Sequence, residues 1–193
     1  VLEQTCQQIV RWQDAGLPML PVSINLSLTT LLEKGFVTEL RDCLQLWQVP
    51  KSALHIEVIE TVHFPRLADA HWDLQDLRDL GVELALDDFG TGYSSLAMLK
   101  DLPVSRIKID RRFVRNITED AQDDRIVSAL IKLGRDLGLS IVAEGIETEA
   151  QRKCLQALGC THGQGYLFGR PVAPEEFAET CLLSEPSPRA LVS

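Results

Sequence analysis

The sequence predicts one parallel α/β domain. Short runs of β-branched and apolar residues alternate with longer segments in which apolar residues recur at helical spacing. No linker-like stretch interrupts residues 1–183, whereas the polar, proline-containing tail 184–193 is predicted to be disordered. Strands that alternate with helices are typical of parallel sheets. Two architectures satisfy the alternation, an open doubly wound sheet and a (β/α)8 barrel.

The predicted strands are short and rich in Val, Ile and Leu. We predict strands at residues 21–26, 54–59, 82–86, 106–109, 140–143 and 161–166.

The predicted helices each carry one apolar face. In the segment 120–137, Ile126 and Leu130 recur at helical spacing, and Thr148 with Gln151 three residues later is a capping-box pattern. We predict helices at residues 1–15, 35–47, 67–80, from 94 to before Pro103, 120–137, from 148 to before Gly159, and from Pro174 onward.

The composition excludes several classes of function. A formal net charge of −9 disfavours binding to a nucleic-acid polymer, because such surfaces are normally basic. The apolar runs are too short to span a bilayer, so this chain is predicted to contain no membrane segment. The five cysteines are scattered without metal-ligand spacing, which favours reduced, mostly buried thiols and a cytoplasmic domain. A longer parent protein can still carry a membrane anchor.

Polar side chains occur at or near the carboxyl end of every predicted strand. They are Asn25, Glu57, Asp87, Asp88, Lys108, Asp110, Glu144 and Gln164. In a barrel they would meet at one mouth, whereas in an open sheet they would be strung along an edge. A single acid after a strand is usually a helix cap or a solvated loop residue. Repetition over all the strands argues for a shared site.

Carboxylates brought together require cations, because their mutual repulsion is otherwise costly. Oxygen ligands without His or Cys suit Mg²⁺ or Mn²⁺ better than Zn²⁺. The adjacent Asp87 and Asp88 can contact two metals, one of these residues bridging them. Two hard cations close together are the usual machinery for in-line attack on a phosphodiester.

Five ordered motifs resemble those of EAL domains. The most specific is the ten-residue segment D-D-F-G-T-G-Y-S-S-L at 87–96. The others are S-I-N-L-S at 23–27, I-K-I-D with F-V at 107–114, A-E-G-I-E-T at 143–148 and Q-G-Y at 164–166.

The resemblance implies a (β/α)8 barrel that hydrolyses cyclic di-GMP to linear pGpG with Mg²⁺ or Mn²⁺. It implies that Lys108 holds or helps activate the attacking water, that Glu144 is a candidate base, and that Gln164 contacts substrate. Residues 89–95 are the implied mobile loop, and its implied supports are Glu60, Glu147 and Asp110. The implied metal ligands are Asn25, Glu57, Asp87, Asp88 and Glu144.

The sequence departs from the family pattern in two ways. The family begins with two further strands, the second of which carries the E-A-L glutamate, a metal ligand, and a nearby arginine that contacts substrate. The chain starts at Val1 without them, so we expect an incomplete barrel. We also expect residues 1–193 alone to hydrolyse cyclic di-GMP at least about a hundredfold more slowly than the complete domain. The second departure is Ile59, which occupies the usual threonine position of E-x-T-E.

The resemblance also indicates partners and one alternative function. Cyclic di-GMP is the expected ligand, and the parent protein is expected to carry sensory or GGDEF-type domains. Exposed strand edges favour a homodimer. The alternative is a degenerate EAL domain that acts as a cyclic-di-GMP receptor or protein-interaction module without cleaving its ligand. Retention of the acidic residues favours the enzyme.

Overall fold

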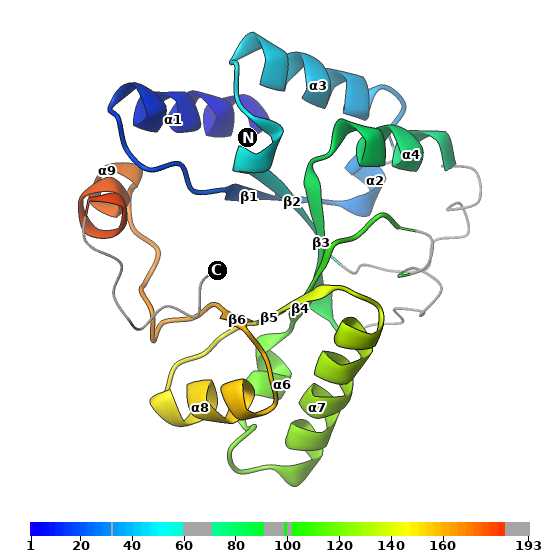
Figure 1. Ribbon diagram of the computed structural model, residues 1–193, viewed down its shortest axis with the longest axis vertical. Coiled ribbons are helices and arrows are strands. Elements are labelled where there is room, and N and C mark those ends of the chain that lie inside the picture. The colour runs from blue at the N-terminus through cyan, green and yellow to red at the C-terminus, as the bar shows by residue number, and fades with distance from the viewer. Residues whose placement is uncertain (32, 60–70, 91–98, 100–101, 184–193) are drawn as a thin grey trace.

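A six-stranded parallel sheet forms the centre of the molecule (Figure 1). The computed structural model describes residues 1–31, 33–59, 71–90, 99 and 102–183. Its strands are β1 (Val22–Leu26), β2 (Leu54–Ile59), β3 (Glu83–Phe89), β4 (Arg106–Ile109), β5 (Ser140–Ala143) and β6 (His162–Gly163). Each strand pairs with the next one in the sequence, in the order β1-β2-β3-β4-β5-β6.

This strand order decides between the two predicted architectures. A doubly wound sheet reverses its strand order at a switch point, whereas the strands of a (β/α)8 barrel follow one another around the axis. The described sheet contains no reversal, and it curves with the helices on its convex side (Figure 1). The structure is therefore an incomplete barrel of the (β/α)8 type.

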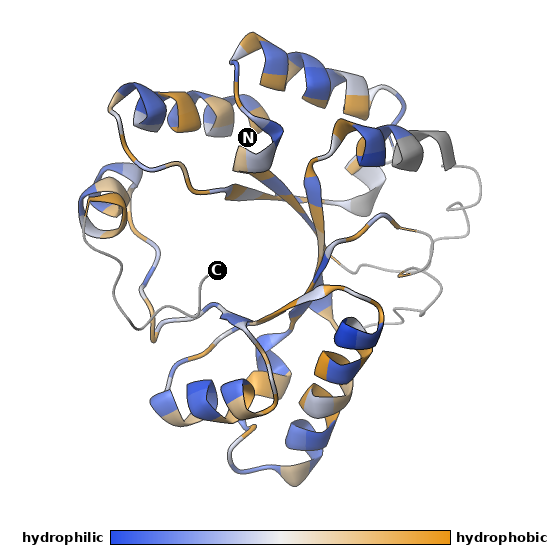
Figure 2. Ribbon diagram, viewed as in Figure 1, coloured by the Kyte–Doolittle hydropathy of each residue, from blue (hydrophilic) through white to orange (hydrophobic). Residues whose placement is uncertain are grey.

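Helices cover the outside of the curved sheet. Figure 2 shows that hydrophobic and hydrophilic residues alternate along these helices, as expected of helices with one apolar face. The α-helices are α1 (Leu2–Asp14), α2 (Leu28–Leu31), α3 (Phe36–Leu46), α4 (His71–Leu80), α6 (Arg111–Arg115), α7 (Ala121–Asp136), α8 (Glu149–Ala157) and α9 (Pro174–Phe177). A 3₁₀ turn, η1 (Lys51–Ala53), precedes β2, and a π-helical turn, η3 (Ala178–Leu182), follows α9.

The hydrophobic core lies between the strands and these helices. Its largest fully buried side chains come from both layers, as in Ile56 and Leu86 from strands and Leu40 and Leu77 from helices. Gly134 lets α7 approach β5 closely, because a Cβ at this position would overlap the side chain of Ile141. The convex face of the sheet is thus used for packing, which leaves the polar residues on the concave face.

Three strands have the predicted bounds, and three differ, with β1 beginning one residue later than predicted. β2, β4 and β5 match the prediction, whereas β3 was predicted to end at residue 86 and continues to Phe89. The pairing of β3 with β4 shifts register between Leu86 and Phe89, and Asp88 lies there with φ 54°. This bulge lets the strand continue past two charged residues while it re-aims their side chains.

β6 is shorter than predicted. It was predicted over residues 161–166 and contains two residues in the structure. The chain leaves the sheet because Gly165 lies directly against the backbone of Ile146, where a Cβ would overlap backbone atoms. The predicted end of this strand is therefore a close loop-to-loop contact.

The helix predictions were largely correct. The capping box of Thr148 and Gln151 is present at the start of α8. The short helices α2 and α6 were not predicted. The predicted segments 67–70 and 94–102 lie largely outside the described residues, as does the tail 184–193. Within the described residues no helix is long and apolar enough to cross a membrane.

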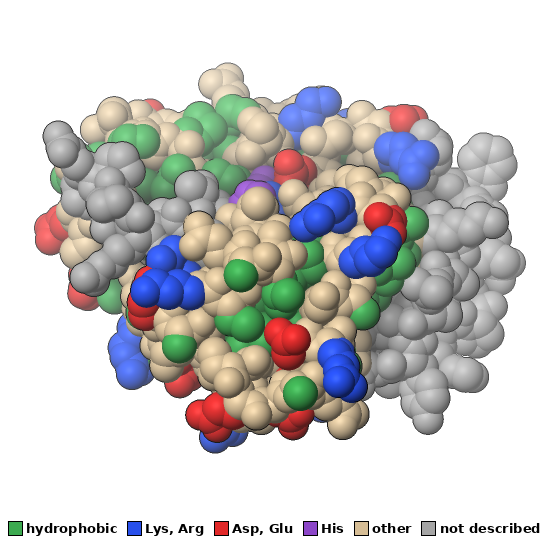
Figure 3. Space-filling model, turned by 60° about the horizontal axis from the view of Figure 1, so that its bottom comes forward, with side chains coloured by type: hydrophobic (Ala, Val, Ile, Leu, Met, Phe, Trp, Pro, Cys, Tyr) green, Lys and Arg blue, Asp and Glu red, His purple; other side chains and the backbone are tan. Residues whose placement is uncertain are grey.

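Charged groups are mixed over the surface. On the face that Figure 3 presents, Lys and Arg side chains lie among Asp and Glu side chains and form no single basic patch.

Candidate active site

The side chain of Lys108 lies at the centre of a cluster of carboxylates. Its Nζ is 2.6 Å from Oε2 of Glu57, 3.2 Å from Oδ1 of Asp87 and 2.6 Å from Oε1 of Glu144. The lysine side chain is only 4% exposed, so these acids replace its water shell. Four residues that are far apart in the sequence therefore meet at one place on the sheet.

The strand register explains how they meet. Glu57 lies on β2, Asp87 on β3 and Lys108 on β4, the three consecutive central strands. Glu144 directly follows β5, and its backbone N–H donates to the carbonyl of Ile109 at 3.1 Å. Since neighbouring strands point side chains of one register to the same face, these residues share the concave face of the sheet.

Asp88 and Asp110 extend the acidic cluster. The left-handed backbone at Asp88 lets its N–H donate to Oδ1 of Asp87 at 2.9 Å. Asp110 caps α6 by accepting from the N–H of Arg112 at 2.6 Å, and its carboxyl group also forms a hydrogen bond with Asp88. The cap thus connects the start of α6 to the metal-ligand candidates.

Burial and neighbouring charges shift the pKa values of three groups in the cluster. Burial alone would lower the pKa of Lys108, but hydrogen bonds from its ammonium to Glu144 and Glu57 outweigh burial and raise that pKa. Burial raises the pKa of Glu144, against the opposing effect of Lys108. Burial, the hydrogen bond to Asp110 and the charge of Asp87 raise the pKa of Asp88.

The donor set fits a hard divalent cation. Asp87, Asp88 and Glu144 offer carboxylate oxygens that all lie within 4.8 Å of one another. One lysine cannot neutralise this many acids, and the charge of Asp87 adds to burial in raising the pKa values of Asp88 and Glu144. Oxygen-only ligands of this kind are typical of Mg²⁺, Mn²⁺ and Ca²⁺ sites.

The remaining site candidates lie around this cluster. Asn25 is exposed on β1 and pairs in register with Glu57 on β2. The side chain of Gln164 is exposed, and its backbone is fixed next to β5, because its N–H donates to Ala143 at 2.8 Å and its carbonyl accepts from Ile146 at 3.0 Å.

The loop-support candidates are less fully described. Glu147 is exposed after β5, and its backbone N–H donates to Oε1 of Gln151 at 2.8 Å. Glu60 and most of the loop 89–95 lie outside the described residues. The supporting roles assigned to Glu60, Glu147 and Asp110 stay predictions.

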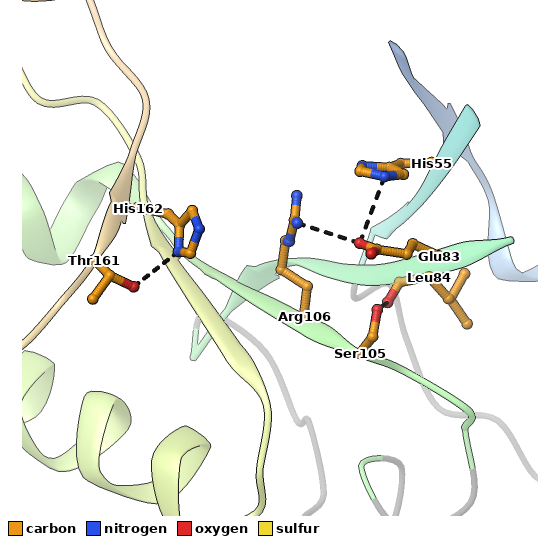
Figure 4. Close-up of polar contacts among 7 residues, drawn as sticks. All are labelled: His55, Glu83, Leu84, Ser105, Arg106, Thr161 and His162. Atoms are coloured by element: carbon orange, nitrogen blue, oxygen red, sulfur yellow. Dashed lines mark hydrogen bonds and ion pairs between the residues drawn. The ribbon is translucent and has the colours of Figure 1, made fainter. Parts of the chain in front are cut away.

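A second polar layer lies on the same face, nearer the amino ends of the strands, and was not predicted. Figure 4 shows Glu83 between Arg106, whose Nη2 is 3.2 Å from Oε2, and His55, whose Nε2 is 3.6 Å away. His162 lies beyond Arg106, with its Nδ1 2.9 Å from the hydroxyl of Thr161. Burial lowers the pKa of His55 and of His162, so both imidazoles favour the neutral form.

Period-two spacing would have revealed this layer. His55, Arg106 and His162 each lie two residues before a candidate site residue. Alternate residues of a strand share one face, so a side chain two positions before a site residue lies directly beneath it. The polar layer therefore forms the floor of the carboxylate cluster.

Comparison with known proteins agrees with the fold. Residues 1–171 match the EAL domain family. This chain belongs to the EAL domain family. It is 45% identical over 177 residues to MucR of Pseudomonas aeruginosa, a bifunctional diguanylate cyclase/cyclic di-GMP phosphodiesterase, and this match covers 91% of the chain and 26% of MucR.

Solved structures of EAL proteins have the same fold. The MucR phosphodiesterase in complex with cyclic di-GMP superposes with a TM-score of 0.82 at 42% identity, covering 91% of this chain and 71% of that one. The EAL domain of Mycobacterium smegmatis DcpA gives 0.87 at 36% identity, covering 92% and 80%. Klebsiella pneumoniae BlrP1, in a manganese/cyclic-di-GMP complex, gives 0.77 at 33% identity, covering 90% and 44%. This EAL chain spans about a quarter of the curated relatives, since it covers 23% and 26% of the first two.

Proposed function

We propose that this EAL domain is a divalent-metal-dependent phosphodiesterase that hydrolyses cyclic di-GMP to linear pGpG. The observation that carries the proposal is the meeting of Glu57, Asp87 and Glu144 around Lys108, with Asp88 beside them. Relatives named as cyclic di-GMP phosphodiesterases support the choice of substrate, as does the complex of MucR with cyclic di-GMP.

The carboxylates would hold the metal. Asp87, Asp88, Glu144 and Glu57, with Asn25 next to Glu57 on β1, are the proposed ligands of Mg²⁺ or Mn²⁺. When bound, such cations would supply Lewis-acid stabilisation of a phosphodiester and of its attacking water. BlrP1 has been solved with manganese and with calcium in cyclic-di-GMP complexes, which supports a divalent ion here. Cations also let an acidic domain accept an anionic dinucleotide.

Lys108 and Glu144 divide the handling of the water molecule. The raised pKa of Lys108 keeps it protonated at neutral pH, so it acts as a hydrogen-bond donor that holds the water. Glu144 is the candidate base, because its carboxylate accepts from the ammonium of Lys108 at 2.6 Å and so lies beside the group that holds the water. Glu144 accepts a proton from the water, the water oxygen attacks phosphorus, and the bond from phosphorus to the ribose 3′ oxygen breaks. A proton from solvent completes the released hydroxyl.

Gln164 is proposed to contact the substrate. Its side chain is exposed beside the cluster while its backbone is fixed between Ala143 and Ile146. A fixed backbone is suited to placing an amide side chain against a ligand, because no backbone freedom is lost when the ligand binds.

The test is an assay on the protein at the full length of its gene, because the chain spans only part of its relatives. Purified protein is incubated with cyclic di-GMP and Mn²⁺, and pGpG is followed by chromatography. We expect turnover that a chelator abolishes. Binding of cyclic di-GMP without pGpG formation, at saturating Mn²⁺, would replace the enzyme by the receptor alternative.

A further inference from the structure

Two cysteines from different helices lie side by side on the outside of the barrel. Cys6 is on α1 and Cys43 is on α3, 37 positions later, and their Sγ atoms are 3.8 Å apart. The thiol of Cys43 donates to the sulfur of Cys6. The two helices are neighbours over the first strands of the sheet (Figure 1).

The two thiols differ in access. Cys6 is 0% exposed, and burial followed by the hydrogen bond to Cys43 raises its pKa to about 12. Cys43 is half-buried. The pair therefore combines a partly exposed cysteine with a fully buried cysteine beside it.

The other cysteines have different surroundings. The thiol of Cys154 donates to Oδ1 of Asp124 at 3.8 Å, and that of Cys160 donates to the carbonyl of His162 at 3.2 Å. Cys181 is exposed. Among the thiol contacts of the described residues, the one that joins two cysteines is thus the contact of Cys6 and Cys43.

We propose that Cys6 and Cys43 are an oxidisable dithiol that forms an intramolecular disulfide with low-molecular-weight disulfides such as oxidised glutathione. The thiolate of Cys43 attacks one glutathione sulfur and releases one glutathione thiolate. The sulfur of Cys6 then attacks the sulfur of Cys43 and displaces the second glutathione, which leaves as the thiol with the proton of Cys6. Two protein thiols are oxidised and one glutathione disulfide is reduced, and the sulfurs need to approach from 3.8 Å to about 2 Å.

The disulfide would act on the edge of the sheet. α1 precedes β1 in the chain and α3 precedes β2, and within the described sheet β1 pairs with β2 alone. Joining the two helices covalently would restrict the movement of α1 over β1, the strand that carries Asn25. Oxidation would thus stiffen one wall of the concave face without touching it.

Peptide mapping tests the proposal independently of any enzymatic activity. Reduced protein carrying Cys181→Ser, which removes the exposed thiol, is incubated with oxidised glutathione, alkylated and digested with trypsin. We expect a linked pair of peptides, one ending at Arg11 and one spanning 42–51. Hydrogen exchange on the oxidised protein is expected to slow at the β1 amides, and dithiothreitol should reverse both effects.

Two variants make the result decisive. In Cys6→Ala the glutathione adduct should remain on Cys43, because its resolving thiol is gone, whereas Cys154→Ser, which removes a thiol bonded to a carboxylate, should still form the link. A stable glutathione adduct on Cys43 in the protein that retains Cys6 would overturn the proposal. Absence of both the adduct and the link, under conditions that modify Cys181 in the native sequence, would overturn it equally.

Discussion

Lys108 acts as a cation that the chain itself supplies to its acidic cluster. Its ammonium group bonds to Glu57 and Glu144 at 2.6 Å each, in a position that water hardly reaches. The lysine stabilises the native state because its folded pKa is raised, and this contribution is present below the unfolded value of 10.5 and is lost as the pH rises through the folded value. At neutral pH it is fully available.

Removing this charge should destabilise the protein. We expect Lys108→Met to lower the free energy of unfolding by about 3 kcal/mol or more, because it leaves buried carboxylates without their partner. Urea denaturation at pH 7 measures it. Lys132→Met is the matched control, since Lys132 forms an exposed pair with Asp136 on α7 and such pairs contribute about 0.5 kcal/mol or less. Equal losses in both variants would contradict the central role of Lys108.

Asp87 is the residue whose charge the proposed reaction requires most directly. It lies between Lys108 and Asp88 in the cluster and is a proposed bridging ligand. We expect Asp87→Asn to reduce turnover of cyclic di-GMP by about a hundredfold or more, because one anionic oxygen is lost from the metal site. Rates of pGpG formation at saturating Mg²⁺ measure the effect. Near-native hydrolysis would mean that the metals lie elsewhere.

The charge of Asp88 is expected to destabilise the folded protein at neutral pH. Its pKa is raised, so its contribution to stability is present below the unfolded pKa of 3.8 and is lost as the pH rises through the folded value. We therefore expect Asp88→Asn to raise the melting temperature at pH 7 in the presence of a chelator. Asparagine also tolerates the left-handed φ of 54° better than most residues.

A pH series separates these two contributions. Below the unfolded pKa the charge of Asp88 is absent in both states, so any remaining gain of Asp88→Asn reports backbone conformation alone. A lower melting temperature for the variant at pH 7 would contradict the assigned destabilisation.

At the scale of elements, strands whose ends are set by local pattern were predicted and those set by tertiary contact were not. β2, β4 and β5 end where apolar alternation ends. β3 passes through Asp87 and Asp88 because a bulge accommodates them, and β6 stops early because Gly165 packs against Ile146. Neither the bulge nor the loop contact has a signature in single-residue propensity.

The same distinction applies to the site. Position at strand ends was enough to predict the meeting of Glu57, Asp87, Lys108 and Glu144, because parallel strands bring their carboxyl ends together. The layer of His55, Glu83 and Arg106 was missed, because it lies at the amino ends of the strands, where polar residues were not sought. The two layers lie one above the other because alternate residues of a pleated strand share one face.

The contact of Gly165 with Ile146 should be intolerant of any side chain. We expect Gly165→Ala to lower the free energy of unfolding by more than about 1 kcal/mol, because the new methyl group overlaps backbone atoms that cannot rotate away. Gly169→Ala is the control, since a Cβ at Gly169 meets nothing within 4 Å. Chemical denaturation of both variants measures the difference. A neutral Gly165→Ala would mean that the loop relaxes freely.

At the scale of the whole molecule, the described residues bring carboxylates together on the concave face of the sheet. This cluster is the proposed site for divalent ions in a chain with a net charge of −9. The consecutive strand order is what brings four strands' side chains within reach of one another. Metal binding should therefore report on the integrity of the barrel wall.

Divalent ions should stabilise the folded protein by mass action. We expect Mn²⁺ to raise the melting temperature in a concentration-dependent way, by about 2.7 kcal/mol in unfolding free energy at a hundred times its Kd. Differential scanning fluorimetry measures it, with NaCl at matched ionic strength as the control. Asp87→Asn should lose most of the shift. A shift that persists in the variant would place the dominant ion outside the cluster.

The arrangement at Gln164 separates the groups that hold the chain from the side chain that is proposed to contact a ligand. Two backbone hydrogen bonds, to Ala143 and Ile146, fix this position, and neither involves the amide side chain. Substitution at position 164 can therefore change the ligand contact while the loop keeps its path. Mutations of Gln164 are therefore expected to have little effect on folding. Related proteins could change their ligand preference at this position without compensating mutations elsewhere.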